Sequence, residues 1–120
     1  MTQFTNSSKM IDKSELQNRF LKDAPNRRMG AIASDLVRLA NLAKASQIDP
    51  VFSSSLFLEL KLFTEWVAPG ASMETQELLL GLQRCIVRWE RDGIFSEARN
   101  WSDKILEIAG LTVTKDTLSS

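Results

Sequence analysis

The sequence predicts an all-helical fold, an up-down antiparallel four-helix bundle with a short extra N-terminal helix. Two observations carry this prediction. Apolar residues recur every three or four positions over long segments, and cap or turn residues separate these segments at short intervals. We expect residues 1–26 to form a mobile arm that contains the short helix, residues 27–111 to form the bundle, and residues 112–120 to form a flexible tail.

The first two expected helices are both amphipathic. The short N-terminal helix has apolar residues on one side and ends at the turn-forming residues 23–26, DAPN. The first bundle helix is expected from about Arg27 to Ser46, and its alanines favour helix and allow a neighbour to approach closely. Their apolar sides consist of Leu16, Phe20 and Leu21 in the short helix and of Met29, Ile32, Ala33, Leu36, Leu39, Ala40 and Ala43 in the bundle helix.

Capping residues delimit the second and third bundle helices. Asp49 is a good N-cap and Pro50 suits the first helical position, so the second helix is expected to begin there. It should end at residues 68–70, Ala-Pro-Gly, because a residue before proline avoids helical geometry. The third helix is expected from about 73 to 91, with Ser72 as its cap.

The fourth helix is expected from about 96 to 109, capped by Ser96 and ended by Gly110. On helical wheels Trp89 and Trp101 both face inward, so we expect the two rings to meet near the turn between the third and fourth helices. The core residues predicted for this hairpin are Leu82, Cys85, Trp89, Trp101 and Ile105.

The second and third helices have more apolar surface than one core-facing side requires. Beside its core stripe, the second helix carries another apolar stripe, and the third helix carries apolar residues opposite its core side. The core stripe of the second helix is Phe52, Leu56, Leu60, Phe63 and Val67, and the surplus residues are Val51, Leu58, Leu62, Leu80 and Val87. Three explanations remain open: the short N-terminal helix covers the surplus, a second copy does so in a homodimer, or the residues are exposed without consequence, as scattered surface leucines often are.

Composition excludes several functions. Fifteen basic residues balance fifteen acidic ones, so nucleic-acid binding is not expected. The chain has no histidine, which removes the most common metal ligand and general base. No apolar run spans a bilayer and no signal sequence is recognisable, so we expect a cytoplasmic protein without membrane contact. We expect no cofactor, no bound metal and no catalytic residue.

Two sets of charged residues are candidates for chemistry. Glu74 and Glu77, with Glu97 and Asn100, resemble the paired-carboxylate pattern of magnesium-dependent helical enzymes that hydrolyse nucleotides. Antiparallel pairing opposes that role, because it places Glu97 about 18–25 Å from Glu77 along the bundle. The other set, an outer stripe suited to an anionic group or a partner protein, consists of Arg84, Arg88 and Arg91.

Three segments, RMGAIASDLVRLANLA, FLELKLFTEWVAP and WSDKILEIAGL, resemble small uncharacterised all-helical proteins of cyanobacteria. The resemblance covers about residues 27–111 and implies a cytoplasmic helical domain without an activity. The residues themselves favour a non-catalytic interaction or adaptor module that associates with itself. A magnesium-dependent nucleotide-hydrolysing enzyme is the alternative, and nucleic-acid binding through the arginine stripe ranks third.

Overall fold

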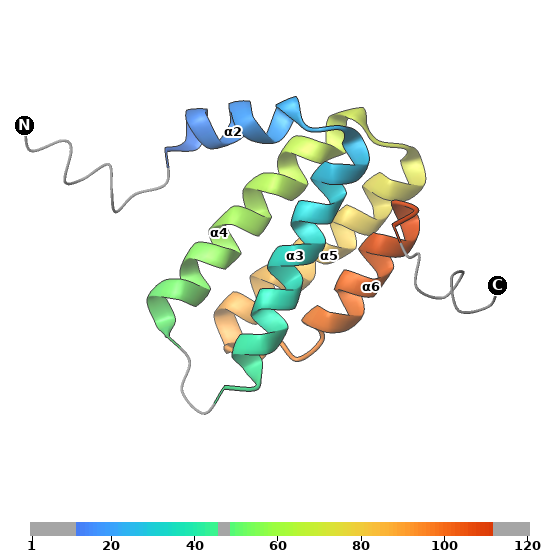
Figure 1. Ribbon diagram of the computed structural model, residues 1–120. Coiled ribbons are helices and arrows are strands. Elements are labelled where there is room, and N and C mark those ends of the chain that lie inside the picture. The colour runs from blue at the N-terminus through green and yellow to red at the C-terminus, as the bar shows by residue number, and fades with distance from the viewer. Residues whose placement is uncertain (1–11, 46–48, 112–120) are drawn as a thin grey trace, which may run out of the picture.

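The computed structural model describes residues 12–45 and 49–111, and every regular element within them is helical (Figure 1). The predicted all-helical class is therefore confirmed. The elements are α2 (Lys13–Lys22), α3 (Pro25–Ala43), α4 (Pro50–Val67), the 3-10 turn η1 (Ala68–Gly70), α5 (Met73–Asp92) and α6 (Ala98–Ile108). The beginning of the predicted arm, up to residue 11, and the predicted tail, 112–120, lie outside the described residues.

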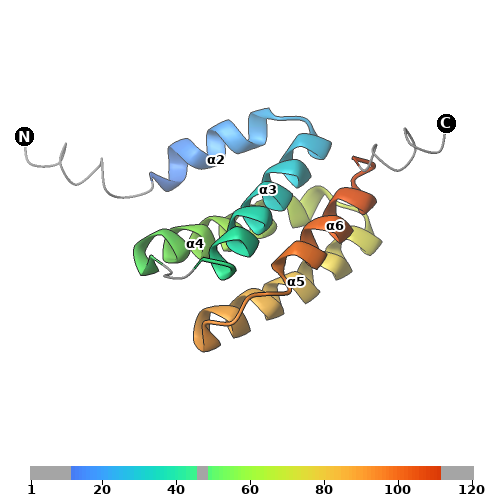
Figure 2. The same cartoon turned by 60° about the horizontal axis from the view of Figure 1, so that its bottom comes forward.

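Helices α3 to α6 run in alternating directions, so that each is antiparallel to the one before it (Figures 1 and 2). Helix α3 packs between α4 and α6, and α5 packs against α4 and against α6. Helix α2 crosses the C-terminal part of α4, where Phe20 stacks on Phe63 with 4.4 Å between ring centroids. None of the helices in the described part of the chain is long and apolar enough to cross a membrane.

Local capping explains where α4 and α5 begin. The Asp49 carboxylate accepts a hydrogen bond from the backbone N–H of Val51 at 2.9 Å, with Pro50 in the first helical position. The Ser72 hydroxyl accepts one from the N–H of Thr75 at 3.2 Å. Helix α5 ends at Gly93, whose φ of 72° is a left-handed conformation that favours glycine.

The expected start of the last helix is wrong. Residues 96–97 form a turn, the helix begins at Ala98, and Ser96 does not cap it. The reason lies in the core: Phe95 is buried and packs edge-on against Phe57 of α4, with 5.6 Å between ring centroids. This contact draws the chain inward just before α6, so the first helical turn forms later than the sequence suggests.

The core lies between α3, α4, α5 and α6. Trp89, Leu82 and Ile105 are buried there, as is the predicted apolar side of α3 apart from the half-buried Ala43. The Ser102 hydroxyl of α6 donates to the carbonyl oxygen of Ala33 at 3.1 Å and satisfies a buried polar group where α3 and α6 approach closely.

Three residues expected in the core lie at its edge. Trp101 is half-buried and packs over Gly81 rather than meeting Trp89; a Cβ atom at Gly81 would lie 3.2 Å from its ring. Glycine at this position allows the indole to lie on the helix surface. Cys85 is also half-buried. Phe52 is exposed, because it sits in the first turn of α4, where core cover from the neighbouring helices is incomplete.

Candidate functional site

Four of the five surplus apolar residues remain exposed after α2 has packed. The exposed fractions are 74% for Val51, 43% for Leu58, 53% for Leu80 and 56% for Val87. We call these four residues the outer apolar face. The N-terminal helix therefore leaves this surface open, although it covers part of α4.

Leu62, the fifth surplus residue, is buried, and its assignment to an exposed stripe is corrected. Leu62 and Trp66 are four residues apart on α4 and share one side of it. That side meets α2, because the rings of Phe20 and Trp66 are 5.7 Å apart. Of the α2 residues expected to provide cover, Phe20 is buried and Leu16 half-buried, whereas Leu21 is exposed.

Two contacts join α4 to α5 beside the outer apolar face. The Lys61 ammonium pairs with the Glu90 carboxylate at 2.8 Å, and the Gln83 amide donates to the Thr64 hydroxyl at 3.0 Å. Val87 lies between Gln83 and Glu90, one helical turn from each.

Leu58 precedes Lys61 by one turn, so Leu58 and Val87 flank the same ion pair from the two helices. Val51 lies two turns before Leu58 on α4, and Leu80 lies two turns before Val87 on α5. Because α4 and α5 are antiparallel (Figure 1), these two residues extend the face in opposite directions.

A hollow of about 410 Å³ lies on the α4 part of this face. It is lined by Pro50, Val51, Ser54, Ser55 and Leu58. The two serines are small, so the helix surface is indented between the larger apolar side chains. Residues 50–58 carry no charged side chain, so the lining of the hollow is uncharged.

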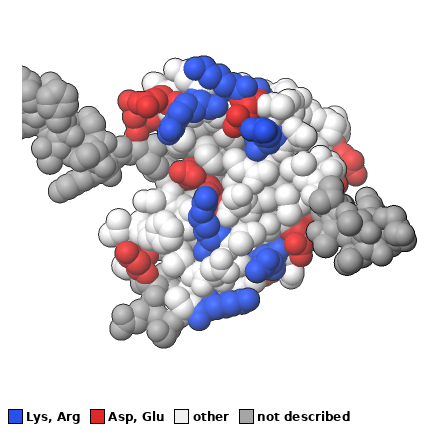
Figure 3. Space-filling model, viewed as in Figure 1, with Lys and Arg blue, Asp and Glu red and all other residues white. Residues whose placement is uncertain are grey.

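The arginine stripe is largely neutralised by neighbouring acids. Arg88 pairs with Glu97, and Arg91 pairs with Asp92 at 2.9 Å, while Arg84 is exposed. A hydrogen bond from Trp89 and the charge of Arg88 lower the pKa of Glu97 below its usual value. Figure 3 shows acidic and basic side chains interspersed on the visible face of the molecule. Because two of its three arginines are paired with acids, the stripe offers no concentrated positive charge.

The carboxylates of the magnesium pattern do not come together. Glu74 and Glu77 line one hollow with Glu107 and Lys104, where antiparallel pairing predicts the end of α6. Glu97 lies beside Trp89 instead, accepting its indole N–H at 3.1 Å. Within residues 12–45 and 49–111, no group of three or more histidine, cysteine, aspartate or glutamate side chains is arranged to hold a metal ion.

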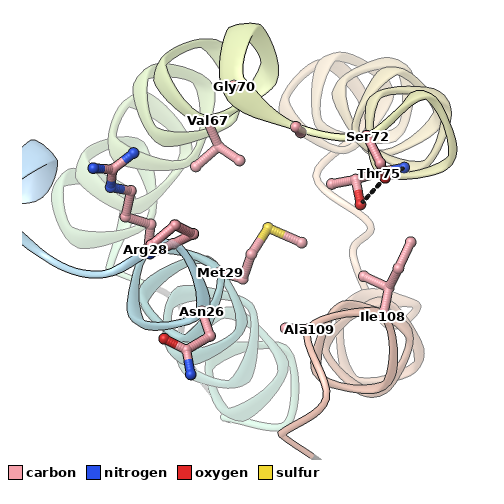
Figure 4. Close-up of a pocket in the computed structure, with 11 residues that line it drawn as sticks. Asn26, Arg28, Met29, Val67, Gly70, Ser72, Thr75, Ile108 and Ala109 are labelled. Carbon is pink, nitrogen blue, oxygen red and sulfur yellow. Dashed lines mark hydrogen bonds between the residues drawn. The ribbon is translucent and has the colours of Figure 1, made fainter.

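A cavity of about 320 Å³ opens at the end of the molecule where α3 and α5 begin and α6 ends (Figure 4). Met29, Val67 and Ile108 point into it. Arg28 also lines it but points away and donates to the carbonyl oxygens of Leu21 and Asp23. The lining therefore combines apolar side chains with the hydroxyl groups of Ser72 and Thr75.

The least expected charged group is Asp35 on α3, which is buried and accepts a hydrogen bond from Arg38 at 2.7 Å. Burial, together with the facing carboxylate of Glu59 on α4, raises the pKa of Asp35 from 3.8 to about 8. The sequence held a signal for it: Asp35 lies three residues after Ile32 and four before Leu39, on the predicted core side.

The candidate features are thus the outer apolar face, an arginine stripe largely paired with acids, a cavity of mixed lining and a buried carboxyl group. Comparison of the chain with protein-family models, with curated proteins and with solved structures finds no match.

Proposed function

We propose that the chain is a non-catalytic protein-interaction or adaptor module that forms a homodimer through the outer apolar face. The observation that carries this proposal is the exposure of Val51, Leu58, Leu80 and Val87. A helix on the outside of a monomer needs only one apolar side, and exposed apolar groups that gather on one surface mark interaction sites. We also propose an up-down four-helix bundle as the folding unit and a cytoplasmic location.

A second copy is the partner that best matches this surface. The face combines projecting side chains with an uncharged hollow beside Val51, and a two-fold axis lets the projecting side chains of each copy meet the hollow of the other. Burial of apolar area stabilises association by about 25 cal/mol per Å², before the entropic cost of association. The Lys61–Glu90 pair lies between the apolar residues, and its methylene groups add to the contact.

The face is tested by placing negative charges on it. The variant Leu58→Glu/Val87→Glu changes two exposed side chains, so it should fold with the helical content of the wild type. We expect it to be monomeric in light scattering at concentrations where the wild type is dimeric, because two buried charges would lack partners. Leu21→Glu, at an exposed leucine on α2, is the matched control and should leave the dimer intact. A double variant that dimerises like the wild type would refute the proposed face.

The two alternatives gain no supporting observation from the described residues. In the magnesium pattern, Glu77 lies on α5 and Glu97 lies just before α6, beside Trp89. The two carboxylates therefore do not share a site. Two of the three arginines that would bind a nucleic acid are paired with acids. The resemblance to cyanobacterial helical proteins stays a prediction.

A further inference from the structure

The Asp35 side chain is an exception in the core of this molecule. Only 1% of the residue is exposed, and the neighbouring Ile32, Leu36 and Leu39 on α3 are completely buried. Its Oδ1 atom accepts a hydrogen bond from Arg38, but its Oδ2 atom is buried and has no hydrogen-bond partner among the described residues. A charged carboxylate with an unsatisfied oxygen in apolar surroundings is unfavourable, so a protonated carboxyl group fits this position better.

The charged groups around Asp35 indicate which of its oxygens carries the proton and which group accepts the hydrogen bond. Glu59 lies on α4, which packs against α3, and is the acidic group that acts on Asp35, while Arg38 is the opposite charge. Lys61, also on α4, is directed to α5, where it pairs with Glu90. The charged side chains of α2 and α6 are exposed to solvent. An O–H on Oδ2 of Asp35 would donate to Glu59 and satisfy the unpartnered atom.

We propose that Asp35 is protonated in the folded protein and donates its proton to Glu59, forming a pH-sensitive clamp between α3 and α4. Loss of the proton leaves two facing carboxylates with one arginine, and their repulsion weakens the packing of the two helices. The effect extends to α2, because Glu59 lies one turn before Phe63, on which Phe20 stacks. The clamp is thus closed in acid and neutral solution and opens as the pH rises.

The direction of the pH dependence follows from linkage. Burial raises the pKa of Asp35 in the folded protein above its value in the unfolded chain. Between these two values the folded state binds more protons than the unfolded state, so stability falls as the pH rises. One linked proton increases the unfolding equilibrium constant by up to about tenfold per pH unit. Groups with lowered pKa values, such as Glu97, act oppositely and only in more acidic solution.

Urea unfolding of the full chain between pH 5 and pH 9 tests the clamp. The wild type should lose stability steadily across this range. Asp35→Asn retains a donor for Glu59 without a titrating group, so its stability should vary much less, and it should exceed the wild type at pH 9. Glu65→Gln, at an exposed carboxylate on α4, is the control and should follow the wild type. An Asp35→Asn variant with the pH slope of the wild type would overturn the proposal.

A direct titration keeps the proposal testable if a variant fails to fold. The carbon-13 resonance of the Asp35 carboxyl group in the folded wild type should titrate near neutral pH or above. In Glu59→Gln the facing charge is absent and the amide donates to Asp35, so the titration midpoint should move to lower pH. A midpoint in the usual aspartate range in the wild type, or one that Glu59→Gln leaves unchanged, contradicts the clamp.

Discussion

Trp89 joins the end of α5 to the segment that precedes α6. Its ring is 1% exposed, and its indole N–H donates to the Glu97 carboxylate at 3.1 Å. Glu97 also pairs with Arg88, so one carboxylate links a core side chain to a surface charge. The aromatic and basic residues near the turn thus have separate roles, since Trp89 packs in the core and Arg88 lies at the surface.

Replacing Trp89 with alanine should lower the free energy of unfolding by about 3–5 kcal/mol, because a large buried ring leaves a cavity. Trp101→Ala is the matched control. Its ring is half-buried over Gly81, so a smaller loss is expected. Urea denaturation of both variants measures the difference. Equal losses at the two positions would contradict the separation of a core tryptophan from a surface one.

Burial of individual residues was predictable where it depends on the residue's own helix. The period of apolar residues placed Trp89 and Leu82 inward, and both are buried. Trp101 and Leu62 were misplaced, because their environments depend on a glycine of α5 and on the crossing of α2. The spacing of Asp35 placed it on the core side of α3, but its raised pKa was not predictable: it arises first from burial and then from Glu59, which only the packing of α4 on α3 brings near.

At the scale of single elements, a helix boundary is predictable when a side chain next to the first turn caps the helix. Asp49 and Ser72 were recognised as caps from the sequence, and both accept hydrogen bonds from the first turns of their helices. Ser96 has an equally favourable sequence context but does not cap α6. The burial of Phe95 against Phe57, a contact between distant segments, decides where α6 begins.

Ser72→Ala should therefore destabilise the protein by about 1 kcal/mol, because a backbone N–H at the start of α5 loses its acceptor. Ser96→Ala should change stability by less than about 0.5 kcal/mol, since this exposed serine caps no helix. Thermal unfolding of the two variants in the same buffer makes the comparison. A larger loss for Ser96→Ala than for Ser72→Ala would show that α6 is capped as the sequence first suggested.

At the scale of the whole molecule, the central feature is the outer apolar face that no helix of the described chain covers. The net charge is zero, so long-range repulsion between copies is weak and does not oppose association. The excess apolar surface was predictable from the sequence, because two helices carry apolar residues on more than one side. The part of this surface that α2 covers was not predictable, because it depends on the direction in which α2 crosses α4.

Sedimentation equilibrium of the wild-type chain over a wide range of protein concentration tests self-association most directly. A dimer predicts an average mass that rises with concentration from 13.5 kDa to twice that value and then stays constant. A mass that remains at 13.5 kDa at the highest concentration would contradict the homodimer.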